Sequence, residues 1–249
     1  MQRFLLPALM LLALLAACGG NDKAPLPDKN EQQVLKQFYF PLPQLKDGLV
    51  YEFLDQNSNN VDHFWFYKTV EDQAGNWYLV STRYNRDFQQ DQIVRERIYA
   101  EGAHCESYRF IQTDSAGKSL TSDAAITGGV IYPFDVPKDS ALVYRFQMEF
   151  FLPKDSMTYT VTRDRRFSRF EEGVEWDGKK HRCAVFQSLQ HVGVRDTLRG
   201  GNWQLDSNSV EEVYAQNIGL IRSSIRLSSG GTLAYKLGAR LTMDEFMKK

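Results

Sequence analysis

The chain has 249 residues with 30 basic and 31 acidic side chains, so its formal net charge at pH 7 is -1. This balance provides neither the basic field that nucleic acid requires nor an acidic block for cations. The length permits one large all-β domain or two small ones, and the 16 Phe, 12 Tyr and 4 Trp residues suffice for a sizeable core.

Residues 1–17 have the pattern of a secretory signal peptide. Arg3 provides a positive start, and the following run 4–17 is apolar, rich in Leu and Ala, and ends in small residues. The run is shorter than the roughly 20 apolar residues that cross a bilayer core. An ordinary cleaved signal peptide and a buried helix are the alternative interpretations, and the next motif argues against both.

The motif Leu15-Ala16-Ala17-Cys18 resembles the lipobox of bacterial lipoproteins. The resemblance implies diacylglycerol transfer to the Cys18 thiol, cleavage before Cys18, and acylation of the new amino group, for example by palmitate. Two or three acyl chains anchor a protein stably to a membrane. Gly19 and Gly20 follow the cysteine without the Asp that retains enteric lipoproteins in the inner membrane. The resemblance therefore implies the outer membrane, at its periplasmic or its surface face.

Polar residues with two prolines follow the cysteine over 19–31 and predict a flexible tether. Three parts are therefore expected along the chain. They are a lipoprotein signal peptide at 1–17, the lipidated Cys18 with its tether at 18–31, and a single β-rich globular domain at 32–249.

Alternation of apolar and polar side chains predicts strands along most of this domain. Residues 142–152 alternate in this way, and 157–162 do so again after the hairpin loop 153–156. Many short strands with close-set turns predict an all-β fold with minor helix, namely a strongly bent antiparallel sheet, half-barrel or open barrel of about 10–12 strands. Short helices are expected at 32–38 and 243–249. The other expected strands are 49–54, 61–70, 76–84, 92–100, 106–112, 126–132, 167–172, 182–191, 210–216, 219–227 and 231–238.

Two cysteines remain in the domain after Cys18 is assigned to the anchor. Cys105 and Cys183 form an even pair in an exported, oxidising compartment, and a disulfide between them would contribute about 4 kcal/mol. Two free buried thiols are the second alternative. A zinc site is the third, because His104 precedes Cys105 and His181 lies two residues before Cys183, although the spacing differs from that of structural zinc sites.

The sequence lacks the common catalytic signatures, including the nucleophile elbow, the phosphate loop and the dinucleotide-binding glycines. His63 is interpreted as a strand-end residue rather than a base. The charged triplets Arg95-Glu96-Arg97 and Asp164-Arg165-Arg166 are interpreted as solvated strand or turn residues, with a functional anion site as the alternative. We therefore expect no catalytic residue, no cofactor, no metal and no enzymatic activity.

Aromatic clusters are the remaining indication of function. The runs Phe64-Trp65-Phe66-Tyr67 and Trp77-Tyr78 place large apolar groups on both faces of a strand. Such a strand must be covered on both sides, either by the rest of the fold or by a ligand. In the second case these six residues are the candidates for a ligand groove on the concave face of a bent sheet.

The C-terminal third contains the run 178–186, with Cys183, and about 30 residues later the run 213–222, Val-Tyr-Ala-Gln-Asn-Ile-Gly-Leu-Ile-Arg. These runs resemble the end of uncharacterised exported β-proteins related to the lipoprotein-carrier half-barrel superfamily. The resemblance implies a close-packed or bulged Gly219, with Tyr214 and Leu220 in the core. It also implies a cavity for acyl chains, which in the carriers lies between a curved sheet and helical lids. This sequence predicts little helix from which such lids could be built.

The leading hypothesis is a non-enzymatic, membrane-anchored envelope lipoprotein that binds an apolar, lipid-like ligand or an envelope partner through its curved sheet. One alternative is a structural or assembly component of an envelope complex without a small-molecule ligand. Another is a hydrolase whose catalytic residues are dispersed over several strands. The expected contacts are a membrane through the lipid anchor and an apolar ligand or envelope protein, without nucleic acid.

Overall fold

The computed structural model describes residues 34–139, 141–196 and 199–249. Contacts divide the chain after Gln32, so the described residues all belong to the second unit, 33–249. The predicted signal peptide, the lipobox with Cys18 and the tether lie outside the described residues. Within the described ranges, no helix is long and apolar enough to cross a bilayer.

Strands dominate the described residues. The first eight are β1 Leu49–Asp55, β2 Val61–Glu71, β3 Trp77–Asn85, β4 Gln90–Ile98, β5 Gly102–Thr113, β6 Ser119–Asp123, β7 Ala125–Gly128 and β8 Val130–Pro133. The next six are β9 Tyr144–Leu152, β10 Met157–Trp176, β11 Lys179–Asp196, β12 Asn202–Ala215, β13 Gly219–Arg226 and β14 Thr232–Leu241. The helical segments are the 3-10 helices η1 Val34–Phe38 and η2 Leu42–Leu45 and the α-helix α1 Met243–Phe246.

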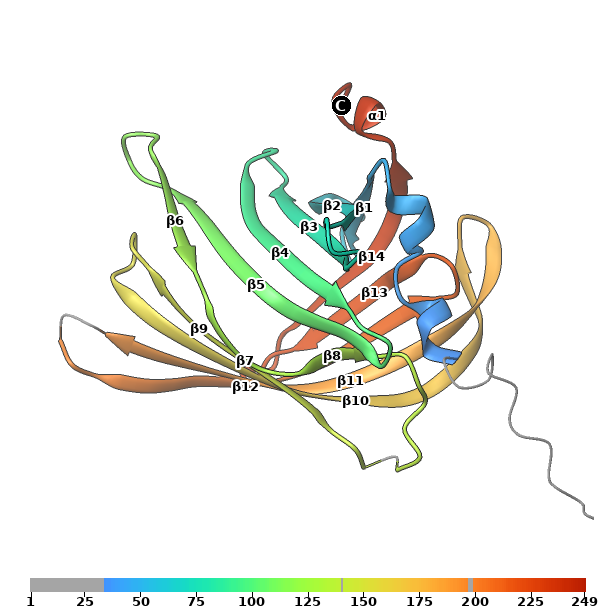
Figure 1. Cartoon of the computed structure of the whole chain (residues 1–249). Coiled ribbons are helices and arrows are strands. Elements are labelled where there is room, and N and C mark those ends of the chain that lie inside the picture. Colours follow the sequence, from blue (N-terminus) through green and yellow to red (C-terminus); the bar gives the residue numbers. More distant parts are fainter. Residues whose placement is uncertain (1–33, 140, 197–198) are drawn as a thin grey trace, which may run out of the picture. The chain divides into compact units, whose positions relative to one another are not determined.

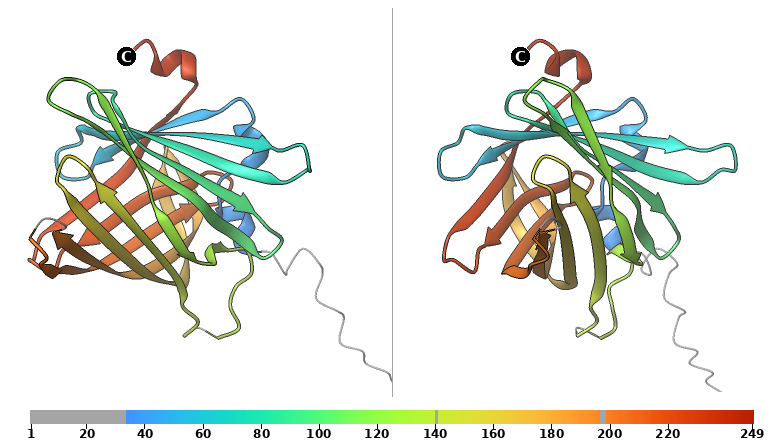
Figure 2. Two further views of the ribbon diagram at one scale, coloured as in Figure 1. Left: turned by 60° about the vertical axis from the view of Figure 1, so that its left-hand side comes forward. Right: turned by 90° about the vertical axis from the view of Figure 1, so that its left-hand side faces the viewer.

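These 14 strands form one antiparallel sheet, in the order β6-β5-β4-β3-β2-β1-β14-β13-β12-β11-β10-β9-β7, with β8 paired to β5. The pairing of β1 with β14 joins the first and last strands, and the sheet bends into a nearly closed barrel (Figure 1, Figure 2). One seam, between the edge strands β6 and β7, has no ladder of backbone hydrogen bonds. Beside it Phe110 of β5 stacks on Phe150 of β9, with ring centroids 3.9 Å apart.

The predicted fold class is confirmed, with more strands than expected. β6 was not predicted, because Leu120 is its only large apolar residue. The expected strands 157–162 and 167–172 are one strand of 20 residues, β10, because the charged residues between them have partners on both faces of the sheet. The expected strand 126–132 is divided into β7 and β8.

The segment that contains η1 and η2 fills part of the barrel interior. Leu35 and Phe38 have no exposed surface and pack in the main core cluster with the inward side chains of the strands. Backbone hydrogen bonds also hold the segment: Leu35 N donates to Phe134 O at 2.9 Å and Asn217 N donates to Gln37 O at 2.8 Å. The interior that this segment leaves unfilled is the candidate site.

The C-terminal turn α1 covers apolar side chains on the outer face of β2. Its N-terminus has a capping box, in which Thr242 accepts from the Glu245 backbone and the Glu245 side chain accepts from the Thr242 backbone. Phe246 is 5% exposed and lies against Phe64, with ring centroids 5.0 Å apart, and against Phe88 at 5.4 Å. This small outer cluster explains why β2 is apolar on both faces.

Candidate functional site

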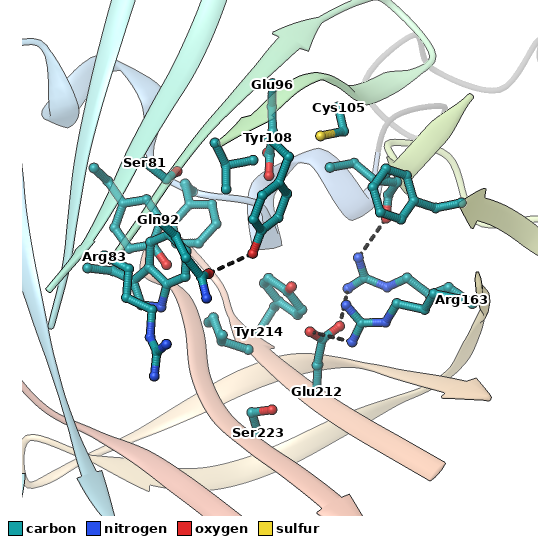
Figure 3. Close-up of a pocket in the computed structure, with 18 of the residues that line it drawn as sticks. Ser81, Arg83, Gln92, Glu96, Cys105, Tyr108, Arg163, Glu212, Tyr214 and Ser223 are labelled. Carbon is teal, nitrogen blue, oxygen red and sulfur yellow. Dashed lines mark hydrogen bonds and ion pairs between the residues drawn. The ribbon is translucent and has the colours of Figure 1, made fainter. Parts of the chain in front are cut away.

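A cavity of about 410 Å³ lies inside the barrel, lined by side chains from many of its strands (Figure 3). One wall is largely apolar and aromatic. Its main residues come from β1, β2, β13 and β14 and are Phe53, Trp65, Tyr67, Ile225 and Tyr235. The other wall carries charged groups from β4, β10 and β12, namely Glu96, Arg163, Arg165 and Glu212.

Two of the six aromatic residues proposed from the sequence line this cavity. Trp65 and Tyr67 alternate along β2 with outward residues, so both face the interior. Their rings are nearly parallel, at 17° and a centroid distance of 6.0 Å, and Tyr67 also lies 4.2 Å from the ring of Phe40. Phe40, Tyr67 and Trp65 thus form a continuous aromatic surface beside the cavity.

The other four lie away from the cavity. Phe64 belongs to the outer cluster under α1, and Phe66 packs partly against that cluster. Tyr78 lies under the guanidinium of Arg95, 3.7 Å from the ring centroid. Trp77, at the first position of β3, has the ammonium of Lys46 5.6 Å from its ring centroid. These four aromatics are therefore covered by the fold itself.

Arg163, Arg165 and Glu212 form an ion cluster in which Arg165 and Glu212 are buried and Arg163 is partly exposed. One guanidinium nitrogen of each arginine lies 2.9 Å from a carboxylate oxygen of Glu212 (Figure 3). Arg165 also donates to the carbonyl oxygen of Ile131 at 2.6 Å, and its guanidinium lies 4.3 Å from the ring centroid of Phe186. Burial raises the pKa of Glu212, but Arg163 and Arg165 outweigh it and hold this pKa below its usual value. Glu212 is therefore ionised at neutral pH.

The burial of Arg165 corrects the interpretation of the triplet 164–166 as solvated. Arg165 is 6% exposed, because the side chains of β10 alternate and this one faces the interior. Its neighbours face outward: Asp164 pairs with Arg145 at 2.7 Å, and Arg166 donates to Gln187 at 3.2 Å. The sequence could have indicated the inward position of Arg165, because apolar residues such as Val161 occupy alternate positions on the same face of the strand.

Glu96 also lies in the cavity wall rather than in solvent. The hydroxyl of Tyr39, which is itself buried, donates to its carboxylate. Burial raises the pKa of Glu96 to about 7, although the Tyr39 hydrogen bond and the charge of Arg165 oppose this. Only the flanking Arg95 and Arg97 match the expectation of an outer position, and both lie near Glu106. Glu96 is thus a carboxyl group that changes its charge near neutral pH.

His63 is the third residue of β2, close to the start of that strand, and its side chain is buried. It is 8% exposed, lines the cavity and stacks on Phe53 with ring centroids 5.1 Å apart. Burial lowers its pKa to about 4, against the opposing effect of Asp62, whose carboxylate lies 2.7 Å from Nδ1. His63 is therefore neutral at physiological pH and adds no charge to the site.

The two cysteines are free in the structure, so the disulfide that was one alternative is not formed. Cys105 lines the cavity from β5, whereas Cys183 is fully buried in the core on β11. Each Sγ faces a carbonyl near it in sequence: Ser107 O at 3.7 Å for Cys105 and His181 O at 3.8 Å for Cys183. Among the described residues, no cluster of three or more His, Cys, Asp or Glu side chains could hold a metal ion.

Gly219 allows the close packing that the C-terminal resemblance implied. Its φ is +99°, and a Cβ atom there would lie 2.6 Å from Cδ1 of Phe40. Tyr214 is buried in the core, as the resemblance implied. Leu220 is partly buried against the same core, and both residues also line the cavity. Gly219 thus lets Phe40 reach the edge of the aromatic wall.

No family model and no curated protein matches the sequence. Among solved structures, the fold is similar to that of a candidate lipoprotein from Parabacteroides distasonis, with a TM-score of 0.50 and 13% identity over 80% of this chain and 95% of that one. A candidate exported protein with a YmcC-like fold from Bacteroides fragilis has a TM-score of 0.47 and 13% identity over 76% of this chain and 92% of that one.

Proposed function

We propose that this protein is a lipid-anchored envelope protein that holds an apolar molecule inside its barrel without converting it. The observation that carries the proposal is the aromatic-lined cavity of about 410 Å³. Ligand sites typically have volumes of about 300–1,000 Å³, with mostly apolar walls and a few fixed polar groups. A fold that needed only stability would fill this interior with side chains, because packed interiors are more stable than hollow ones.

The position of the protein in the cell follows from Cys18 and its lipobox, which we propose to be the anchor. The candidate lipoprotein from Parabacteroides distasonis, which has a similar fold, supports an envelope role. The outer membrane is the proposed site of anchoring. Mass spectrometry of the protein purified from its host tests the anchor. We expect a mass increase equal to a diacylglycerol plus an acyl chain, and we expect the Cys18→Ser variant to lack it. An unmodified Cys18 thiol would contradict the anchor and leave the binding proposal intact.

Binding can be tested with N-phenyl-1-naphthylamine, a neutral apolar dye whose fluorescence rises in an apolar site. The form 19–249 is suitable, because every strand and core residue described lies within 34–249. We expect saturable binding of one dye per chain. Failure of the dye to bind the folded protein, together with native mass spectra of ligand-free protein from the host, would refute the proposed function.

A pair of neighbouring serines on β13 offers matched variants for this test. Ser223 lines the cavity, whereas Ser224 borders a groove on the opposite face of the strand. Ser223→Trp fills part of the cavity and is expected to weaken dye binding by about tenfold or more, which corresponds to a loss of about 1.4 kcal/mol in binding free energy. Ser224→Trp is expected to leave binding unchanged. Equal effects of the two variants would show that the dye binds elsewhere.

A hydrolase is the second candidate, and one observation favours it. Glu96 holds its proton up to a pKa of about 7, whereas the pKa of Glu212 is lowered, and both line the same cavity. Two carboxyl groups with separated pKa values are typical of general acid and base pairs. Turnover of 4-nitrophenyl esters or glycosides by the wild type, lost in Glu96→Gln, would support this candidate. Dye binding without turnover would support the binding function.

A further inference from the structure

The charged wall of the cavity has an excess of positive charge. Arg163 and Arg165 share one carboxylate, Glu212, so the cluster of three carries one uncompensated positive charge. Arg165 is 6% exposed, and Glu212 is 8% exposed. A buried charge without a partner is costly, so a site of this kind favours a counter-ion.

Hydrogen-bond donors in the same cluster also lack partners. The Nε groups of Arg163 and Arg165 are buried, and neither has an acceptor in the described protein. Buried donors of this kind are normally satisfied by protein, water or ligand. Arginine N–H groups match a carboxylate in geometry and form charge-assisted hydrogen bonds with it. Both arginines line the cavity, so a ligand there can reach the cluster.

Glu96 removes only part of this excess charge at neutral pH. It approaches the cluster from β4, where the groups acting on it are Tyr39, Arg165 and Glu212. With a pKa of about 7 it is only partly ionised, and its carboxylate accepts from Tyr39 rather than from an arginine. The opposite wall, with Trp65 and Tyr67, carries the charged side chain of Arg83, which has its own counter-ion in Asp91 at 3.1 Å.

We propose that the cavity selects amphiphiles with a single anionic head group, which binds at Arg163 and Arg165 while the apolar part lies along the aromatic wall. This inference rests on the proposed binding function and specifies its ligand class. One excess positive charge fits a monoanion such as a carboxylate. A neutral head group would leave that charge uncompensated, and a cationic one would add to it.

The test is competition for bound N-phenyl-1-naphthylamine on the form 19–249 at neutral pH, with dodecanoate and 1-dodecanol as competitors of equal chain length. Dodecanoate is expected to displace the dye at a concentration at least about tenfold lower than 1-dodecanol requires, because charge-assisted hydrogen bonds are about twice as strong as neutral ones. Equal competition by the two compounds would overturn this inference while dye binding upholds the proposed function. Failure of the dye to bind would refute the proposed function itself.

Two arginines on opposite faces of one strand provide the matched variants. Arg163→Gln removes the excess charge and leaves Arg165 to pair with Glu212, so dodecanoate is expected to lose its tenfold advantage while 1-dodecanol changes less than about twofold. Arg166→Gln changes an outward residue that donates to Gln187 and is expected to leave the advantage unchanged. Circular dichroism and thermal unfolding verify that both variants fold. A dodecanoate advantage that persists in folded Arg163→Gln would contradict the assignment.

Discussion

The protonation of Glu96 links the cavity to the stability of the barrel. Its pKa is about 7 in the folded protein and 4.5 in the unfolded chain, mainly because burial disfavours the carboxylate. Between these values the folded state binds more protons than the unfolded state, so the stability falls as pH rises. The contribution of Glu96 is fully present below about pH 4.5 and is lost by about pH 7. At about 1.36 kcal/mol per pH unit, the full interval corresponds to about 3 kcal/mol.

The variant Glu96→Gln isolates this contribution. Glutamine keeps an acceptor for the Tyr39 hydroxyl but cannot ionise. We expect the stability of the wild type relative to Glu96→Gln to fall by about 2–3 kcal/mol between about pH 5 and about pH 8. Urea unfolding of both proteins, followed by circular dichroism across this range, gives the difference directly. The other titrating groups cancel in the comparison to the extent that they do not interact with Glu96.

Glu175→Gln is the matched control, because Glu175 is an exposed residue of β10. Its stability relative to the wild type is expected to stay constant with pH within about 0.5 kcal/mol. A pH-independent difference for Glu96→Gln as well would show that Glu96 ionises normally in the folded protein. The account of Glu96 as a buried group beside Tyr39 would then be wrong.

Two further predictions concern packing around the barrel. Gly219→Ala is expected to lower the free energy of unfolding by about 2–5 kcal/mol, because its φ of +99° strains an alanine and the new Cβ meets Phe40. Gly230→Ala has a similar φ of +98° but open space around the new Cβ, so it should lose only the strain of about 1–3 kcal/mol. Equal losses in urea unfolding would exclude the Phe40 contact. Phe246→Ala is expected to lower the free energy of unfolding by about 3 kcal/mol, because it removes the packing against Phe64. Met247→Ala is the control and should lower it by less than about 0.5 kcal/mol, because Met247 is 75% exposed. A Phe246→Ala protein of unchanged melting temperature would show that α1 contributes little stability.

Period-two alternation predicted the fold class because the barrel is built from it. The hairpin of β9 and β10 is the clearest case: Phe150 pairs with Tyr159 and Met148 with Val161, as the alternating apolar residues required. Sheet order and closure were not predictable, because the pairing of β1 with β14 joins segments at opposite ends of the domain. No local pattern carries information about such a distant contact.

The site was predicted only in its aromatic half. Trp65 and Tyr67 are inward residues, but a strand that is apolar on both faces does not reveal which face is inside. Phe64 therefore entered the prediction although α1 covers it. The charged half was misinterpreted, because Arg165 and Glu96 were considered as members of charged runs rather than as single positions in an alternating strand. Apolar residues occupy alternate positions on the same strand faces as Arg165 and Glu96, and this pattern could have predicted that both side chains face the interior.

The two halves of the cavity follow from one structural property of the barrel. A nearly closed sheet has an inside whose residues come from many strands, so the aromatic residues of β2 and the charges of β10 and β12 share one space although they are far apart in sequence. A buried ion cluster is usually less stable than apolar residues of similar volume, and an unfilled cavity costs further stability. Neither feature helps the barrel to fold. The proposed ligand, apolar along most of its length and negatively charged at one end, would account for their combination.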